Sequence, residues 1–160
     1  MTTSWIERHL GQFDKDFCRA LSEIEKGQKR CHWMWWIFPQ AKGLGKSPRA
    51  KESAIESLDE AVACLAHPAF GDRYCRIVDA VWSQVAKCGT PVKIMFPYPD
   101  DRKLVSSLTL FRRAAENLAQ LQRPESDRRA FSLLVDQSTE ILERAQGEGL
   151  DPCSRSQGLE

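Results

Sequence analysis

The chain has 160 residues, of which 42% are hydrophobic and 28% charged, and its formal net charge is +1. This composition is typical of one soluble globular domain, and it gives no overall electrostatic attraction to nucleic acid or to an anionic membrane. No apolar run approaches the roughly 18–20 residues of a membrane span, and charges stand where a signal peptide has an apolar stretch. We therefore expect a cytoplasmic protein with no membrane partner and no strong nucleic-acid signal.

Six cysteines are spread through the chain without a CxxC pair or any other short spacing. In a chain of this size that lacks a signal peptide, we expect them to be reduced and mostly structural or incidental. The cysteines and His9, His32 and His67 show no spacing typical of a zinc site. The sequence therefore predicts no metal and no cofactor.

The first half of the chain reads as a series of helices. Apolar residues recur every three or four positions over 5–24, which predicts an amphipathic helix that ends near Gly27. Ser47-Pro48 is typical of an N-cap followed by the first helical residue. A capping-box pattern opens a short helix over 57–65, and a further helix is expected over 68–86.

The second half continues the helical pattern with one exception. The segment 92–96 is β-rich and lies among three prolines, so a short extended segment is expected there, followed by a loop. A long helix is predicted from residue 100 and a last one after Arg123-Pro124. The fold class is therefore expected to be all-α, with a single helical domain over 1–150 and a frayed tail over 151–160.

Three tryptophans lie within four positions in the segment HWMWWIFPQ, residues 32–40. The surrounding interval from Lys26 to Lys51 has seven cations and no carboxylate, so a local positive field is expected. Each indole N–H needs a hydrogen-bond partner, so at least one tryptophan is expected at a surface or in a cleft. Two interpretations stay open: the cations are solvated flanks of a buried aromatic segment, or tryptophan and cations together bind a nucleotide.

The motif GLGKS, residues 43–47, is similar to the end of a phosphate-binding loop. The Walker pattern requires a glycine where this chain has Gln40, so the motif fails. A weaker expectation remains, because Gly43 and Gly45 allow close backbone approach and Ser47 opens a helix whose free N–H groups attract an anion.

The segment PDDRKLVSSLTLF, residues 99–111, places two aspartates at a predicted helix start, beside a polar face with Lys103 and two serines. Such carboxylates are favourable at the positive end of a helix and serve there without any catalytic role. The alternative is that one of them binds a ribose hydroxyl or acts as acid or base on a glycosidic bond.

Five blocks together resemble a family of bacterial and fungal proteins of unknown function that is often labelled calpastatin-like. The blocks are HWMWWIFPQ, GLGKSPRAKESAI, SLDEAVACLAHPAFG, PDDRKLVSSLTLF and GLDP, and the resemblance covers roughly residues 5–152. It implies a single, mostly helical domain and supplies no activity. Calpastatin itself is a disordered inhibitor, whereas this chain has periodic apolar segments that can build a core.

The order of an aromatic block, a Ser-Pro helix start and a late acidic block is also similar to that of the NADAR proteins, small helical domains associated with ADP-ribose and related N-glycosides. That resemblance implies that Trp33 or Trp36 stacks on a base and that Lys46 and Arg49 meet phosphates. It also implies that one of the aspartates engages the ribose.

We therefore expect the tryptophan and aspartate segments to meet in one cleft that binds a small phosphorylated nucleoside of the ADP-ribose or NAD type. If the protein is an enzyme, we expect metal-independent cleavage of an N-glycosidic bond, with Asp101 favoured over Asp100 as the catalytic carboxylate. The alternative is a non-enzymatic interaction module with an exposed tryptophan-rich patch. The oligomeric state is not indicated. The candidate ligand-binding residues are His32, Trp33, Trp36, Gln40, Gly43, Gly45, Lys46, Ser47, Arg49, Lys103, Ser106 and Ser107.

Overall fold

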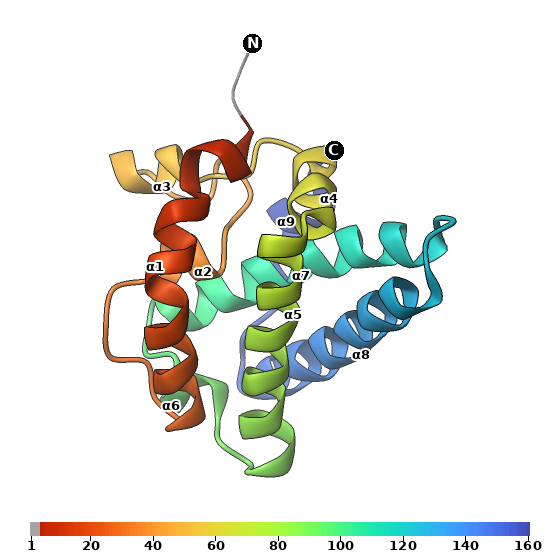
Figure 1. Ribbon diagram of the computed structural model, residues 1–160. Coiled ribbons are helices and arrows are strands. Elements are labelled where there is room, and N and C mark those ends of the chain that lie inside the picture. The colour runs from red at the N-terminus through yellow and green to blue at the C-terminus, as the bar shows by residue number, and fades with distance from the viewer. Residues whose placement is uncertain (1–3) are drawn as a thin grey trace.

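The computed structural model of the protein describes residues 4–160, which fold into helices joined by loops (Figure 1). Within these residues the one extended pairing is an isolated bridge between Ala41 and Ile55, so the all-α expectation is confirmed. The helices are α1 (Trp5–Glu25), α2 (Met34–Ile37), α3 (Pro48–Glu52), α4 (Leu58–Ala66), α5 (Pro68–Trp82), the π-helical turn η1 (Ser83–Lys87), α6 (Val92–Met95), α7 (Asp100–Gln120), α8 (Glu125–Gly147) and α9 (Ser154–Gly158).

Serine side chains begin several of these helices. The Ser47 hydroxyl accepts a hydrogen bond from the Ala50 amide at 3.1 Å, and the Ser57 hydroxyl accepts one from the Glu60 amide at 3.1 Å. Both serines therefore satisfy an amide that has no partner within its helix. The predicted helix starts at Ser47 and Ser57 are confirmed.

Helix α7 forms the centre of the fold. It pairs along its length with α8, and α4 packs across it, while α1 and α5 run side by side (Figure 1). Its apolar face is fully buried and meets an aromatic cluster in which Phe70 stacks on Tyr74, and both contact Phe111. This continuous core packs against α7 from Asp101 to Leu118. No helix within residues 4–160 is long and apolar enough to cross a bilayer.

The segment 92–96 differs from its prediction, because Val92–Met95 is a turn of helix and not a strand. Val92 and Met95 are buried while the two residues between them are exposed, which is helical spacing. The Glu148 carboxylate accepts hydrogen bonds from the amides of Val92 and Lys93, at 2.8 and 3.0 Å. This distant carboxylate caps the turn and overrides the local β propensity.

The C-terminal residues also differ from the expected frayed tail. Helix α9 packs against α7, with Ser156 fully buried and Leu159 7% exposed. Arg113 of α7 donates hydrogen bonds to the carbonyl oxygens of Ser156 and Leu159, at 2.8 and 2.7 Å. A guanidinium thus satisfies the backbone of a polar segment whose own sequence has no apolar period.

Candidate functional site

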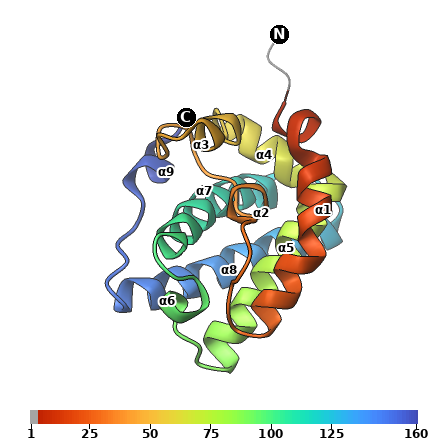
Figure 2. The same cartoon turned by 90° about the vertical axis from the view of Figure 1, so that its left-hand side faces the viewer.

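A cleft of about 540 Å³ opens where three distant segments meet. Both segments that were predicted to form the main cleft contribute to it, and a third segment precedes α9. Figure 2 shows how α2 and α9 flank α7. The lining residues are Trp35, Gln40, Leu44 and Gly45 from the first segment, Pro99, Arg102, Lys103, Val105 and Ser106 from the second, and Gly149, Leu150, Asp151 and Cys153 from the third.

The ring of Trp35 and the ammonium of Lys103 face each other in this cleft. The Lys103 Nζ atom lies 3.8 Å from the ring centroid, which is a close cation–π contact. The same ammonium is 3.5 Å from the Asp100 carboxylate. Gly45 packs beside the indole, and a Cβ atom there would lie 3.9 Å from Trp35 and would overlap Ala50. The cleft therefore presents a half-buried aromatic ring together with a cation.

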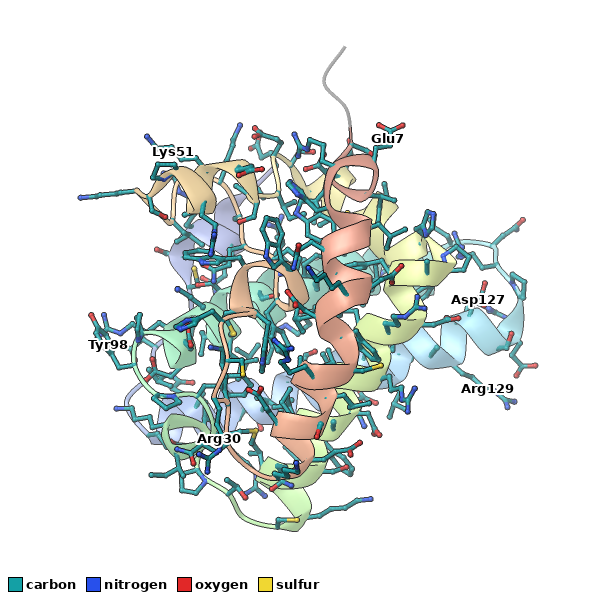
Figure 3. The ribbon with its side chains drawn as sticks, turned by 60° about the vertical axis from the view of Figure 1, so that its left-hand side comes forward. Glu7, Arg30, Lys51, Tyr98, Asp127 and Arg129 are labelled. Carbon is teal, nitrogen blue, oxygen red and sulfur yellow. The ribbon has the colours of Figure 1, made fainter. Side chains whose placement is uncertain are left out.

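A second cation, Arg102, lines the cleft one residue earlier. Its guanidinium lies 5.1 Å from the ring centroid of Tyr98, which is 72% exposed and extends away from the body of the molecule (Figure 3). Arg102 itself is exposed. The stacked arginine is thus accessible to an anion from solvent.

Gln40 contributes an unpaired polar atom. Its side-chain Nε2 is buried and has no hydrogen-bond partner among the residues that the structure describes. The backbone at this position is fixed, because the Gln40 carbonyl accepts a hydrogen bond from the Ile55 amide at 2.8 Å beside the Ala41–Ile55 bridge. The backbone that carries this side-chain amide is therefore fixed at the cleft wall.

Cys153 brings a thiol to the third wall. Burial raises the pKa of this thiol, but hydrogen bonds from Ser106, Ser156 and nearby backbone amides outweigh burial, and the net effect lowers the pKa. The Ser156 hydroxyl is 3.3 Å from the sulfur. In contrast, burial raises the pKa of Cys64 and of Cys75 to about 12. Cys153 is therefore chemically distinct from the buried thiols, which the sequence did not indicate.

A buried carboxylate lies behind the tryptophan segment. One oxygen of Glu23 accepts hydrogen bonds from the amides of Arg30 and Cys31, at 2.6 and 2.9 Å, and from the indole N–H of Trp33 at 3.0 Å. Burial raises the pKa of Glu23, but these hydrogen bonds outweigh it and lower the pKa to about 2. Glu23 therefore stays ionised and orders the loop that leads into α2.

Lys29 joins this loop to the start of α7. Its ammonium lies 2.7 Å from the Asp100 carboxylate, donates to the Cys31 carbonyl at 2.7 Å and sits 5.1 Å from the Trp33 ring centroid. The Lys29 side chain is only 7% exposed. We call Glu23, Lys29, Trp33 and Asp100 the Glu23 clamp. It holds the tryptophan segment against α7 and so fixes two walls of the cleft.

Four of the predicted ligand-binding residues line the cleft: Gln40, Gly45, Lys103 and Ser106. Two others lie in the core. Trp33 is 1% exposed and belongs to the Glu23 clamp, and Ser107 is fully buried with its hydroxyl 3.0 Å from the Tyr74 hydroxyl. Neither side chain lines the cleft.

The remaining predicted residues lie outside the cleft lining. Trp36 is half-buried with its ring centroid 4.9 Å from that of His9, whose pKa is lowered by burial. Gly43 has a φ of +89°, which favours glycine, and the Arg155 guanidinium packs where a Cβ atom would lie. The other members of this set are exposed: they are His32, Lys46, Ser47 and Arg49. Lys51, which shares α3 with Arg49, extends into solvent in Figure 3.

The two candidate catalytic aspartates are placed away from the cleft lining. Asp100 is ion-paired to Lys29 and Lys103. Asp101 is 3% exposed, and its carboxylate accepts a hydrogen bond from the Arg102 amide at 2.8 Å. Both are acidic residues in the first turn of α7, and neither lines the cleft.

The site residues that the sequence missed are Trp35, Arg102, Asp151 and Cys153. Trp35 and Arg102 are direct neighbours of the predicted residues Trp36 and Lys103. The sequence therefore indicated the segments that line the cleft but not which residues within them do so. Within residues 4–160, no three His, Cys, Asp or Glu side chains are grouped closely enough to hold a metal ion.

Comparison with known proteins gives a family and a fold relative. The profile of a family described as "Protein of unknown function (DUF1810)" matches residues 4–127. The chain is also similar to the solved structure described as the conserved hypothetical protein Rv1873 from Mycobacterium tuberculosis. The two are 34% identical, with 84% of this chain and 90% of that chain covered and a TM-score of 0.64. No curated protein matches the chain. The expected resemblance to an uncharacterised family is thus confirmed, whereas neither the calpastatin label nor the NADAR likeness gains support.

Proposed function

The chain belongs to the DUF1810 family, whose function is unknown, and from that premise we propose that it binds a phosphorylated nucleoside of the ADP-ribose or NAD type in the cleft between Trp35 and Lys103. The observation that carries this proposal is the Lys103 ammonium 3.8 Å from the Trp35 ring. An aromatic face supports a base by stacking, and a cation beside it binds phosphate.

The size and lining of the cleft support the same class of ligand. Its volume of about 540 Å³ is in the range of small-molecule sites, which are largely apolar with a few polar groups. Lys103 covers the indole in the free protein, so a base that stacks on that face displaces the ammonium. The ammonium then gains a phosphate partner, and a charge-assisted hydrogen bond is stronger than the cation–π contact that it replaces.

Arg102 supplies the second phosphate contact in this proposal. It lines the cleft beside Lys103, and its fork of N–H donors matches two phosphate oxygens. Two cations and one carboxylate, Asp151, line the cleft. Because Asp100 already pairs with Lys103, the exposed guanidinium of Arg102 is the cation that, within residues 4–160, is free to attract an anion. The exposed cations near α3 are not required.

Cleavage of an N-glycosidic bond, the reaction expected for Asp100 and Asp101, needs a carboxylate that reaches the ribose. Asp151 is the carboxylate in the cleft lining. In our proposal it takes the acid–base role, and Asp100 and Asp101 keep the positions of Lys29, Lys103 and the first turn of α7 fixed.

A thermal-shift panel of AMP, ADP-ribose, NAD, ribose 5-phosphate and inorganic pyrophosphate tests the binding. At about 100-fold excess over Kd, a nucleotide should raise Tm by roughly 5–10 °C, and added salt should weaken the effect. Bound nucleotide should also slow alkylation of Cys153 by iodoacetamide but not that of Cys88, which is exposed outside the cleft. No shift and no protection with any nucleotide would reject the proposal.

The rival proposal, an interaction module with an exposed tryptophan-rich patch, finds less support. All five tryptophans lie in the described residues and are buried or half-buried. The large exposed apolar side chains are others, among them Ile94 and Tyr98 near α6. If no compound of the panel shifts Tm, the interaction-module proposal, with this exposed apolar surface as its candidate site, would be favoured instead.

A further inference from the structure

The unpaired amide of Gln40 has no structural explanation within the fold. Its Nε2 atom is buried without an acceptor, and of the four buried side-chain atoms without a partner in residues 4–160 it is the one whose residue lines the cleft. The Ser106 hydroxyl, which also lines the cleft, donates to the Arg102 carbonyl at 3.0 Å and makes no hydrogen bond with Gln40. A buried donor without a partner destabilises the folded state. A ligand that accepts a hydrogen bond from Nε2 would explain why the chain has a glutamine at this position.

The backbone around Gln40 allows little adjustment. Pro39 precedes it, and the Lys42 amide and the Ile55 amide donate to the carbonyls of Ile55 and Gln40, at 2.9 and 2.8 Å. Both neighbours of Gln40 are buried. Gln40 thus carries its side-chain amide on a fixed backbone, in the lining of the same cleft as Trp35.

We propose that Gln40 makes the cleft selective for adenine among the bases that stack at Trp35; this inference rests on the proposed function. A glutamine amide pairs with the N7 and N6 edge of adenine, since Nε2 donates to N7 and Oε1 accepts from the 6-amino group. Hypoxanthine and guanine carry an oxygen at position 6, which faces the amide oxygen and repels it. A bound adenine therefore gives the amide both hydrogen bonds, whereas a 6-oxopurine gives only the one at N7.

Calorimetric titration with AMP and IMP tests this inference, because the two probes differ at position 6 of the base. Wild-type protein should bind AMP at least tenfold more tightly than IMP. Gln40→Met keeps the length of the side chain and removes both polar atoms, so it should bind AMP about tenfold more weakly and should bind the two probes equally. Its stability to urea should equal or exceed that of wild type.

Equal binding of AMP and IMP by wild type, or preserved discrimination in Gln40→Met, would overturn the inference and leave the proposed function intact. Lower stability of Gln40→Met would show a structural role and would also overturn it. Gln40→Glu serves as the second variant, since it keeps the shape but cannot donate to N7; it should lose AMP binding while remaining folded. If wild type binds neither probe nor any other nucleotide, both the proposed function and this inference fail.

Discussion

Trp33 and Trp35 stand two positions apart, yet they belong to regions of opposite character. In the Glu23 clamp, the indole of Trp33 donates to a carboxylate, and both Glu23 and Lys29 have several short polar contacts. In the cleft, Trp35 faces a lysine and Gln40 has an unpaired donor. Similar residue types occur in both regions. The completeness of polar pairing is what separates the one that builds the fold from the one that offers a binding surface.

The short helix α2 accounts for this separation. Trp33 is the residue before α2 and Trp35 lies within it, and their side chains point to different sides: Trp33 enters the core while Trp35 lines the cleft. Trp33 packs against the rings of Phe38 and Phe96, with centroids 6.2 and 6.3 Å away. Within this short aromatic segment, Trp33 therefore contributes to the stability of the core, whereas Trp35 is available to contact a ligand.

The largest effect should come from removing each tryptophan in turn. Trp33→Ala deletes a fully buried indole and should lower the free energy of unfolding by about 3–5 kcal/mol. Trp35→Ala, its matched control, should lower it by about 1 kcal/mol or less but should abolish nucleotide binding. Urea unfolding and calorimetry measure both quantities. The comparison fails if the two variants lose equal stability or if Trp35→Ala still binds.

A smaller loss of stability is expected when the Glu23 clamp keeps its shape but the Glu23 carboxylate is replaced by a neutral amide. Glu23→Gln should lower the free energy of unfolding by about 2 kcal/mol, because three hydrogen bonds to a carboxylate become weaker ones to an amide. Glu25→Gln changes an exposed neighbour and should cost less than about 0.5 kcal/mol.

The pH dependence of the Glu23 contribution follows from its lowered pKa. The stabilisation is complete above the ordinary value of 4.5 and is lost as the pH falls toward about 2. The stability gap between wild type and Glu23→Gln should therefore shrink over that range in urea titrations at successive pH values. A gap that does not change with pH would show that the charge is irrelevant.

The smallest effect should be on ligand affinity alone. Lys103→Met removes the cation beside Trp35 and should weaken nucleotide binding about tenfold, with a smaller salt dependence. Lys46→Met removes an exposed cation outside the cleft lining and should leave the affinity unchanged. Calorimetry at two salt concentrations distinguishes them. A larger loss of nucleotide affinity in Lys46→Met than in Lys103→Met would indicate that the phosphate binds at the GLGKS loop and not beside Lys103.

Local signals predicted what depends on local structure. The caps at Ser47 and Ser57 and the break before α8 follow from short-range hydrogen bonding and proline geometry, so they could be found in the sequence. The turn at 92–95 and the docking of α9 could not, because Glu148 and Arg113, both far along the chain, satisfy their backbone groups.

The same distinction applies to the cleft. That the two segments meet was predicted from their surplus of polar and aromatic residues. Which side each residue faces depends on the exact phase of α2 and α7, and the residue of this segment that lines the cleft is Trp35 and not Trp36. Cys153 gave no signal, because its lowered pKa arises from neighbours that only the fold assembles.

The wall that carries Asp151 and Cys153 is attached differently from the other two. Its anchors are the two bonds from Arg113, the burial of Leu159 and a hydrogen bond from the Leu58 amide to the Glu160 carbonyl, at 3.0 Å. We expect release of this segment to leave the α7–α8 pair intact, with an opening free energy lower than that of global unfolding. A molecule held across the cleft bridges the released part and the fixed part. Ligand binding in the cleft should therefore slow amide hydrogen exchange in the last turn of the chain, at residues that do not contact the ligand.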